Sequence, residues 1–281
     1  MQIIEDPHQM QELSMGLRLA GKRIALVATN GALHAGHAAL IQRAREQAEV
    51  VVLSAMVNPK EFGPNEDYQR YPRCSAEDAQ FAEDNGVDVL FRPEARVLFP
   101  PGYSCHMEED GISKTLCGVS RPTYFKGVCT LYVLLLNLIR PDLILVGWRD
   151  AQKAAVLEKL VAECFFKVSV ERVPTVREAD GLPANARNRY LNDFQRKDAA
   201  TLHRALLEGK RLVENGIRNI DRVLAEVTHH LTQVRRLRVI YVAAVNPVTM
   251  EPCRYALEPG HTLVMTAVWC DEVRLIDNIL L

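Results

Sequence analysis

The sequence predicts an α/β fold, in which a doubly wound parallel sheet is followed by a smaller α+β domain. Short β-branched runs alternate with helical patterns through the first 175 residues, and the pattern changes after Pro174. The chain has 281 residues, of which 48% are apolar and 25% charged, so it can bury a sizeable core. We expect one domain over 1–177 and a second over 178–281, with the boundary in the turn-rich stretch 178–186.

The first part shows the alternation expected of a parallel sheet. The predicted strands are 24–28, 50–57, 87–91, 143–146 and 168–173. The predicted helices, which carry apolar residues at i, i+3 and i+4 spacing, are 35–48, 76–85, 128–139 and 151–164. In such sheets ligands bind beyond the carboxyl ends of the strands. The second part predicts helices at 194–214 and 220–235 and strands at 238–244, 262–268 and 273–276.

Charge and composition exclude several classes of function. Lys and Arg number 34 against 35 Asp and Glu, so the net charge of −1 gives no general reason to bind nucleic acid or an anionic membrane. The longest apolar run, 131–139, is half of the roughly 20 residues that a membrane span needs. Seven cysteines without a C-x-x-C pair suggest neither a disulfide framework nor a zinc knuckle. We therefore expect a soluble, cytoplasmic protein.

The segment 28–37, ATNGALHAGH, joins a strand end to a helix start through a glycine turn. Gly31 and Gly36 let the backbone approach a ligand, and the start of the helix favours an anion there. His34 and His37 lie three residues apart and can share one helix face. They could equally be structural hydrogen-bond donors. The spacing is similar to the H-x-G-H signature of nucleotidyl-transferring Rossmann enzymes, whose imidazoles stabilise charge on the α-phosphate.

Two polar loops are further candidates for the site. The stretch 57–73 follows the second predicted strand and is too rich in Pro, Gly and Asn for helix or sheet, so it could form a substrate wall or a plain surface loop. The stretch 174–191 contains Arg177, Arg187 and Arg189. These arginines could clamp phosphate oxygens or could be solvated.

Together the motifs GALHxGH, VNPxxFGPNEDxxRYPR, RPxxFxGV, PTVREADGL, ARNRYL and RLIDN resemble those of the pantoate-beta-alanine ligase family (pantothenate synthetases), in order and from about residue 20 to the C-terminus. The resemblance implies a Rossmann-like domain of the H-x-G-H nucleotidyltransferase type, a lid domain and a homodimer. It also implies a reaction with ATP and Mg2+. A carboxylate and ATP give an acyl-adenylate and pyrophosphate, and an amine then forms the amide and releases AMP.

The resemblance assigns roles residue by residue. It makes His34, His37 and Arg187 catalytic, the last by closing on the β- and γ-phosphates. The ATP-binding residues that it implies are Asn30, Gly31, His34, His37, Gly147, Arg149, Asp150, Val176, Asn185 and Arg187. It places Asn58, Glu61 and Lys153 at the acid substrate and Asp78 at the metal ion.

The chain departs from the family pattern within these motifs. It has ATNG at 28–31 in place of P-T-M-G, and GWRD at 147–150 in place of G-E-K-D, so that Arg149 keeps the positive charge but changes its shape. R-P-G-H-F becomes RPTYF at 121–125. Two serines of the family become Asn185 and Ala186, and Asn185 could replace one of the lost phosphate donors.

The most consequential departures are Glu61 and Lys153, which align with two family glutamines that hold pantoate. They could form a compensating salt bridge, or they could select a different acid, because a pocket built for particular hydrogen bonds rejects analogues strongly. A degenerate site is a third possibility, and the retained H-x-G-H segment, Asn58, Asp78 and Arg187 argue against it.

We therefore predict an ATP-dependent carboxylate-amine ligase, either with the family's substrates or as a paralogue that uses a different acid or amine. Two other classes stay open at this point. A nucleotidyltransferase would use the H-x-G-H segment to join AMP to an acceptor and stop there. A regulator would bind the nucleotide without turnover.

Overall fold

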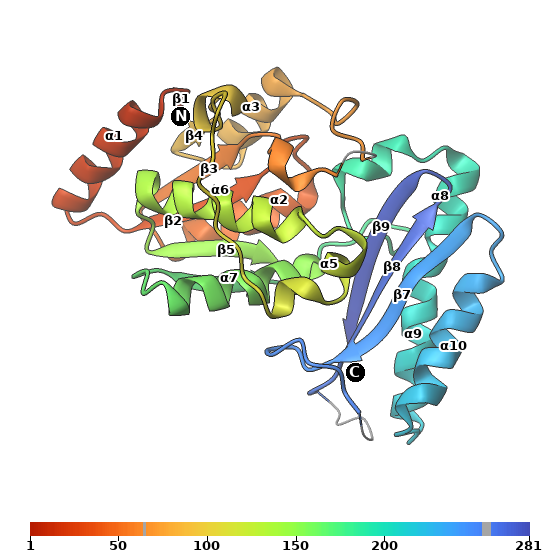
Figure 1. The fold of residues 1–281 in the computed structure, drawn as a ribbon. Coiled ribbons are helices and arrows are strands. Elements are labelled where there is room, and N and C mark those ends of the chain that lie inside the picture. Colours follow the sequence, from red (N-terminus) through yellow and green to blue (C-terminus); the bar gives the residue numbers. More distant parts are fainter. Residues whose placement is uncertain (64–65, 255–259) are drawn as a thin grey trace.

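The computed structural model describes residues 1–63, 66–254 and 260–281 and shows two lobes, each built on one sheet (Figure 1). The first sheet has six strands, all parallel, in the order β1-β4-β3-β2-β5-β6. Its strands are β1 (Gln2–Ile4), β2 (Ile24–Thr29), β3 (Val50–Ala55), β4 (Val89–Phe91), β5 (Leu143–Gly147) and β6 (Ser169–Val173). The order reverses beside β2, where open α/β sheets bind ligands.

Helices cover both faces of this sheet. They are α1 (Pro7–Leu19), α2 (Ala35–Arg45), α3 (Ser75–Asp84), α6 (Tyr124–Ile139) and α7 (Ala151–Glu163), with short helices α4 (Ala95–Leu98) and α5 (Cys117–Ser120) in the connections. Alternate residues of each strand face opposite sides. Ile24 and Leu26 of β2 pack with α1, α6 and α7, whereas Ala25 and Val27 pack with α2 and α3. The predicted doubly wound parallel sheet is confirmed.

The second lobe is a three-stranded antiparallel sheet of order β7-β8-β9 with helices on one face (Figure 1). Its elements are α8 (Asp193–Ala199), α9 (Thr201–Glu214), α10 (Ile220–Thr232), β7 (Leu237–Val245), β8 (Leu263–Cys270) and β9 (Val273–Leu280). The predicted single helix 194–214 is two helices. Asn192 and Gln195 form a capping box that begins α8, and α9 starts anew after Ala200. The smaller α+β unit is thus confirmed, whereas the boundary at 177/178 stays a prediction.

The sequence prediction missed the first two elements. Asp6 accepts hydrogen bonds from the backbone N–H groups of His8 and Gln9 and so caps α1, with Pro7 at its first position. The strand β1 adds to the edge of the sheet beside β4. Three residues are too few to show a strand pattern in a sequence.

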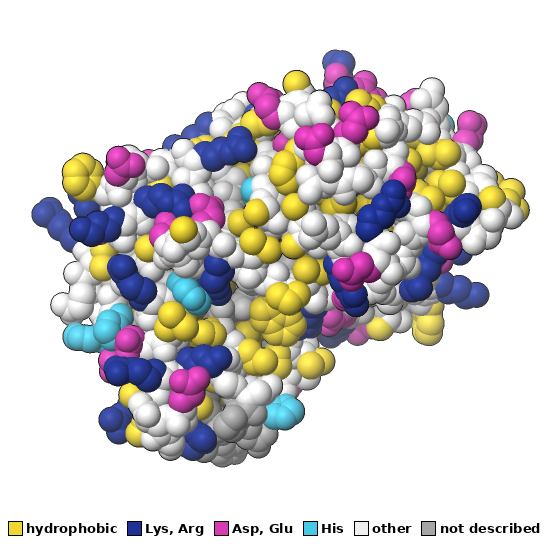
Figure 2. All heavy atoms as spheres, turned by 180° about the vertical axis from the view of Figure 1, so that it is seen from behind, with side chains coloured by type: hydrophobic (Ala, Val, Ile, Leu, Met, Phe, Trp, Pro, Cys, Tyr) yellow, Lys and Arg dark blue, Asp and Glu magenta, His cyan; other side chains and the backbone are white. Residues whose placement is uncertain are grey.

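In the part of the chain that the structure describes, helices long and apolar enough to span a membrane are absent. On the face seen in Figure 2, basic and acidic side chains are interspersed, and neither sign covers a continuous area. This distribution agrees with the net charge of −1. Strongly charged side chains do gather in the lining of a cavity between the two lobes.

Candidate active site

A cavity of about 430 Å³ lies between the two lobes. Its floor is formed by the segments that follow three parallel strands, namely 28–30 after β2, 147–153 after β5 and 174–176 after β6. Its other wall comes from β7, β8 and β9, including Tyr241 and Trp269. The carboxyl ends of the parallel strands and the small sheet therefore enclose one site.

The turn after β2 is shaped by Asp78 of α3. Gly31 and Ala32 both have positive φ, 81° and 52°, a conformation that lets successive N–H groups point to one side. The Asp78 carboxylate accepts the N–H groups of Ala32 (2.8 Å) and Leu33 (2.7 Å). A side chain at Gly31 would lie 2.9 Å from the Asp78 carboxylate, so only glycine fits. Asp78 thus holds the turn in the shape that the site requires.

The two histidines sit where β2 meets α2. His34 is the N-cap, and its Nδ1 accepts the N–H of Gly36 (3.1 Å). The His34 N–H donates to Nδ1 of His37 (3.3 Å), whose Nε2 lies 2.9 Å from Thr29 Oγ1. The ring centroids are 4.0 Å apart, as the shared face predicted. Because each Nδ1 is an acceptor, each neutral ring carries its proton on Nε2.

Both rings are neutral near pH 7. Burial, reinforced by the charge of Arg149, lowers the pKa of His34 to about 3. Burial and the neighbouring His34 lower the pKa of His37 as well. The histidines therefore act as neutral N–H donors. His34 can offer Nε2–H to an anion in the cavity, and Thr29 fixes the orientation of His37.

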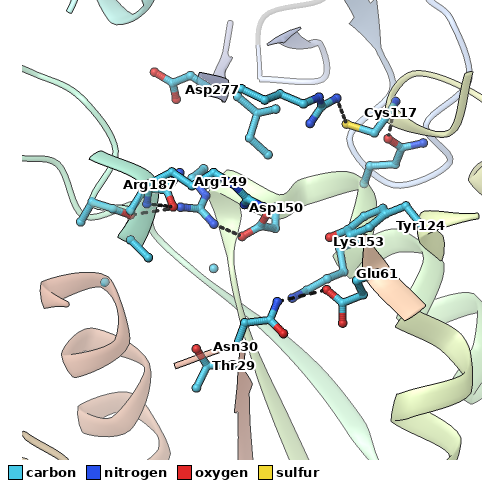
Figure 3. A pocket seen from close by; sticks show the side chains of 18 of the residues that line it. Thr29, Asn30, Glu61, Cys117, Tyr124, Arg149, Asp150, Lys153, Arg187 and Asp277 are labelled. Atoms are coloured by element: carbon cyan, nitrogen blue, oxygen red, sulfur yellow. Dashed lines mark hydrogen bonds and ion pairs between the residues drawn. The ribbon is translucent and has the colours of Figure 1, made fainter. Parts of the chain in front are cut away.

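Arg149 and Asp150 follow β5 in the 3-10 helix η3 (Trp148–Asp150) and form an ion pair of 2.9 Å (Figure 3). Arg149 also donates to the carbonyl of Ala184 (3.1 Å), which orients the guanidinium. Its Nε is buried and has no partner among the described residues. Burial opposes ionisation of Asp150, but the charges of Arg149 and Lys153 outweigh it and hold the pKa of the carboxyl below its usual value. Arg149 thus keeps one donor available for an anionic ligand.

Arg187 lies in the 3-10 helix η4 (Ala186–Tyr190) on the opposite wall. Its Nε and Nη2 donate to the Asp67 carboxylate at 3.0 Å and 2.8 Å. The guanidinium also lies 5.8 Å from the ring centroid of Phe62 and 5.4 Å from that of Tyr71. The N–H of Arg187 donates to the side chain of Asn185 (3.2 Å), which begins the helix. The predicted clamp arginine therefore lines the cavity but is paired in this structure.

A second ion pair joins two motifs that are far apart in the sequence. Arg177 of the PTVREADGL segment donates twice to Asp277 of the RLIDN segment, at 2.7 Å and 3.0 Å. Asp277 is almost fully buried in β9. This bidentate contact connects the loop after β6 with the small sheet, so it fixes how the lid wall meets the floor.

At the other end of the cavity Glu61 is held by amides. It ends the 3-10 helix η1 (Pro59–Glu61) and is only 8% exposed. Asn58 Nδ2 donates to Glu61 Oε1 (3.0 Å) and to the carbonyl of Gly127 (3.1 Å), and Asn58 Oδ1 accepts the N–H of Lys60. Asn30 Nδ2 donates to Glu61 Oε2 (3.3 Å). Both donors of the Asn58 amide are thus used, one of them for Glu61.

Lys153 of α7 enters the same end of the cavity, near Glu61 and Asn30 (Figure 3). Among the described residues its ammonium has neither a hydrogen bond nor an ion-pair partner, and it lies 6.0 Å from the ring centroid of Tyr132. The salt bridge with Glu61 that the sequence allowed is not formed. Burial disfavours the charge of Lys153, but the surrounding phenol and carboxyl groups outweigh it and raise its pKa.

Most of the predicted site residues line this one cavity. They are Asn30, His34, His37, Glu61, Gly147, Arg149, Asp150, Lys153, Val176, Asn185 and Arg187. Gly31, Asn58 and Asp78 stand behind the lining and shape it through the contacts above. Residues 64 and 65 of the loop 57–73 lie outside the described residues.

The predicted metal ligand is the prediction that the geometry supports least. Both Asp78 oxygens accept backbone N–H groups of the turn, and Asp78 does not line the cavity. Within residues 1–63, 66–254 and 260–281 no three or more His, Cys, Asp or Glu side chains gather in a way that could hold an ion. In this structure the Asp78 carboxylate is bound by backbone N–H groups, and its role at a metal ion stays a prediction.

Several lining residues were not predicted. Arg121 lies in a quoted motif but received no role, and it pairs with Glu66 and lies 3.8 Å from the ring centroid of Tyr124. Tyr132 is hidden in an apolar helical run that gives no sign of a polar site. Tyr241 and Arg274 come from the small sheet, and Arg274 Nε is buried with no partner in the described part of the chain. Their position depends on how the lobes meet, which sequence patterns do not show.

An open parallel sheet, a cavity beyond its strand ends, a glycine turn that leads into a helix, and donors such as His34 and Arg149 together define a nucleotide-binding α/β enzyme. The model of the family "Pantoate-beta-alanine ligase" matches residues 2–280. The chain therefore belongs to the pantoate-beta-alanine ligase family, whose members are ATP-dependent ligases.

Individual relatives agree with this assignment. The chain is 39% identical to pantothenate synthetase of Thermotoga petrophila over 281 residues, which cover 100% of both chains. It is 41% identical to that of Chlorobium phaeovibrioides, over 99% of this chain and 95% of the other. The crystal structure of pantothenate synthetase from Thermus thermophilus matches with a TM-score of 0.93 at 34% identity, covering 100% of this chain and 99% of that one.

A second solved structure carries ligands. It is the pantoate-beta-alanine ligase of Francisella tularensis, described as complexed with beta-gamma ATP and beta-alanine. The match has a TM-score of 0.82 at 29% identity and covers 100% of this chain and 97% of that chain. The fold of this chain is thus one that binds ATP in a relative.

Proposed function

We propose that this chain activates a carboxylic acid with ATP and joins it to an amine, with pantoate and β-alanine as the reference substrates. The observation that carries the proposal is the single cavity in which His34, Arg149 and Arg187 meet an end lined by Glu61 and Lys153. One end offers donors for phosphate oxygens. The other has room and charge for an acid.

In the first step a carboxylate oxygen attacks the α-phosphorus of ATP. The bond from that phosphorus to the β-phosphate oxygen breaks, pyrophosphate leaves, and an acyl-adenylate remains. Negative charge grows on the α-phosphate oxygens, so fixed donors that meet it there lower the barrier. His34 supplies a neutral Nε2–H, held in place by its contact with Gly36, and Arg149 supplies a charged donor.

In the second step the neutral nitrogen of an amine attacks the acyl carbon. The carbon–oxygen bond to the adenylate breaks, AMP leaves, and the nitrogen loses a proton to give the amide. Both reactive groups must lie in the same enclosed space, and the walls from Tyr241 and Trp269 close the cavity opposite the strand ends. The donors of the turn remain in place for the departing AMP.

Arg187 is proposed to bind the outer phosphates after leaving Asp67. Its present pair with Asp67 lies on the cavity wall, so exchange of one anionic partner for another needs only a side-chain movement. Mg2+ would arrive with the phosphate oxygens of ATP, its usual ligands in such reactions. No step here runs through a metal ion held by the protein.

The proposal is tested by measuring AMP, pyrophosphate and amide together, with ATP, Mg2+, pantoate and β-alanine. We expect equal amounts of all three. A stable adenylylated acid with no AMP would instead indicate a nucleotidyltransferase. ATP binding by calorimetry without any product, across a panel of acids and amines, would indicate a regulator that has lost turnover.

We also propose a homodimer, on the strength of the family resemblance alone, and a cytoplasmic location, on the strength of the sequence composition. The measurement is light scattering on a size-exclusion column, which should give twice the chain mass of 31.6 kDa. A single chain mass at micromolar concentration would remove the dimer from the proposal. It would leave the chemistry of the cavity untouched.

A further inference from the structure

The acid end of the cavity holds two opposite charges, Glu61 and Lys153, and neither side chain forms an ion pair among the described residues. Lys153 forms no hydrogen bond or ion pair, and Glu61 accepts only from the neutral amides of Asn58 and Asn30, within the described residues. Arg70 and Arg274 also line the cavity and have no carboxylate partner among the described residues. Four other arginines at or beside the cavity are paired with carboxylates. These pairs are Arg121 with Glu66, Arg149 with Asp150, Arg187 with Asp67, and Arg177 with Asp277 on the lid wall.

An unpaired charge that is partly removed from water costs free energy, and a ligand of opposite charge can recover it. Glu61 is almost fully buried, so its oxygens have little access to water. Lys153 lies half-buried against Tyr132. A site with one anion and one cation that are not in an ion pair is complementary to a molecule that carries both charges itself.

The groups around Lys153 determine which end of such a molecule it meets. Tyr124 and Tyr132 line the cavity beside it, and their hydroxyls have no hydrogen bond in the described part of the chain. Burial raises the pKa of Tyr124 to about 12, so its phenol stays a donor. The Lys153 ammonium presents donors only, and each phenol adds an O–H that can donate, which suits a carboxylate. Glu61 presents acceptors, which suits an ammonium.

This orientation also agrees with the chemistry. Lys153 and the two histidines line the same cavity, so a carboxylate bound at Lys153 shares an enclosed space with the proposed donors for the α-phosphate. Glu61 lies on the side of Asn30 and Asn58. A carboxylate held by Lys153 thus attacks phosphorus, while the ammonium at Glu61 stays protonated and does not react.

We propose that the acid which this site activates is a zwitterionic amino acid, with its carboxylate at Lys153 and its ammonium at Glu61. The inference rests on the proposed adenylation step and specifies its substrate class. The same carboxylate oxygen attacks the α-phosphorus and pyrophosphate leaves. The ammonium keeps its proton against Glu61, so it cannot act as the nucleophile, and a second amine forms the amide.

The test is ATP–pyrophosphate exchange with Mg2+, which measures adenylation before any second amine is needed. Matched acids that differ only in the donor group are compared: glycolate with glycine, lactate with alanine, and γ-hydroxybutyrate with γ-aminobutyrate, with pantoate as the reference. We expect at least one amino acid to exceed its hydroxy counterpart and pantoate by about tenfold or more in kcat/KM, since a charged pair at a buried carboxylate discriminates strongly.

The variant Glu61→Gln keeps the shape and removes the anion. For the preferred amino acid we expect kcat/KM to fall by about tenfold, while the hydroxy counterpart changes less than about threefold. The variant with both Glu61→Gln and Lys153→Gln should shift the preference toward pantoate. An exposed control, Glu94→Gln, should leave every acid unchanged.

The outcomes separate the two proposals. Exchange with pantoate or another hydroxy acid that equals or exceeds exchange with every amino acid overturns the zwitterion and leaves the ligase standing. An equal loss for both members of a matched pair in Glu61→Gln does the same, because it shows a structural role only. No exchange with any acid overturns the adenylation and the zwitterion together.

Discussion

The two ends of the cavity handle charge in opposite ways. At the phosphate end the clamp residue Arg187 is held by Asp67, and Arg149 is held by Asp150. At the acid end Glu61 and Lys153 face the same space without pairing. The protein itself supplies the ion-pair partners of the two arginines. For Glu61 and Lys153, a substrate would have to supply them.

The carboxylate that pairs with each arginine holds the guanidinium in place and neutralises only part of its charge. The guanidinium can exchange a carboxylate for a phosphate because both accept the same two N–H groups. Lys153 and Glu61 have no ion-pair partner in the protein that a substrate group could replace. On the proposed function, the phosphate end is balanced by the protein's own carboxylates, and the acid end gives up stability for selectivity toward its substrate.

The largest expected effect is a loss of adenylation rate when the histidines of the phosphate end are replaced. His34→Ala should lower the rate of adenylation by about a hundredfold, because it removes a donor held in place by its contact with Gly36. His37→Ala should lower it by at least about tenfold, since His37 also orients the turn through Thr29. The measurement is pyrophosphate release at saturating acid. His8→Ala, on the exposed start of α1, is the control. Wild-type rates in both site variants would remove the histidines from the mechanism.

The second effect is on stability. Asp67→Asn should lower the free energy of unfolding by about 2 kcal/mol, because it leaves the Arg187 guanidinium half-buried without its carboxylate. Urea denaturation followed by circular dichroism measures it. Glu94→Gln, which breaks a fully solvated pair with Arg96, should change stability by less than about 0.5 kcal/mol. Equal changes in the two variants would mean that the Arg187 pair is no better than a surface pair.

The sequence predicted more of the phosphate end than of the acid end. Strand periodicity, the glycine turn and the H-x-G-H spacing are local signals, and His34 and His37 lie where they predicted. The pairing of Arg187 with Asp67 spans 120 residues and depends on how the lid loop folds back. Asp78 shows the same limit, because its place behind the turn follows from the packing of α3 rather than from any spacing.

At the acid end, the sequence identified Glu61 and Lys153 but could not predict how their side chains lie relative to each other. Glu61 and Lys153 stand out in the sequence, but whether they pair depends on the positions of η1 and α7 relative to each other. The amides of Asn58 and Asn30 that hold Glu61 come from two different strand ends. No sequence pattern marks Tyr132 as a site residue, because apolar helices in protein cores commonly contain a tyrosine.

A third effect uses pH to test the neutral histidines. The unfolded chain protonates His34 with a pKa near 6.5, whereas the folded site holds that pKa at about 3. Between these values the unfolded state binds more protons, so stability is full above pH 6.5 and is lost as the pH falls toward 3. The melting temperature of the wild type should fall more steeply from pH 7.5 to 5 than that of His34→Gln. Identical slopes would show that His34 titrates normally in the folded protein.

The smallest expected effect, on the stability of variants at Glu61 and Lys153, tests the contrast between the two ends of the cavity most directly. Replacing both charges by Glu61→Gln and Lys153→Gln should leave the free energy of unfolding unchanged or raise it by up to about 1 kcal/mol, because each neutral amide is easier to bury than an unpaired charge. The single variants and the double variant together form a cycle, and we expect a coupling energy below about 0.5 kcal/mol, since the two side chains form no hydrogen bond or ion pair. The measurement is the same urea titration used for Asp67→Asn. A loss above about 1 kcal/mol in the double variant, with a coupling of similar size, would mean that Glu61 and Lys153 form a stabilising ion pair in solution. The acid end would then be balanced as the phosphate end is, and the contrast between them would disappear.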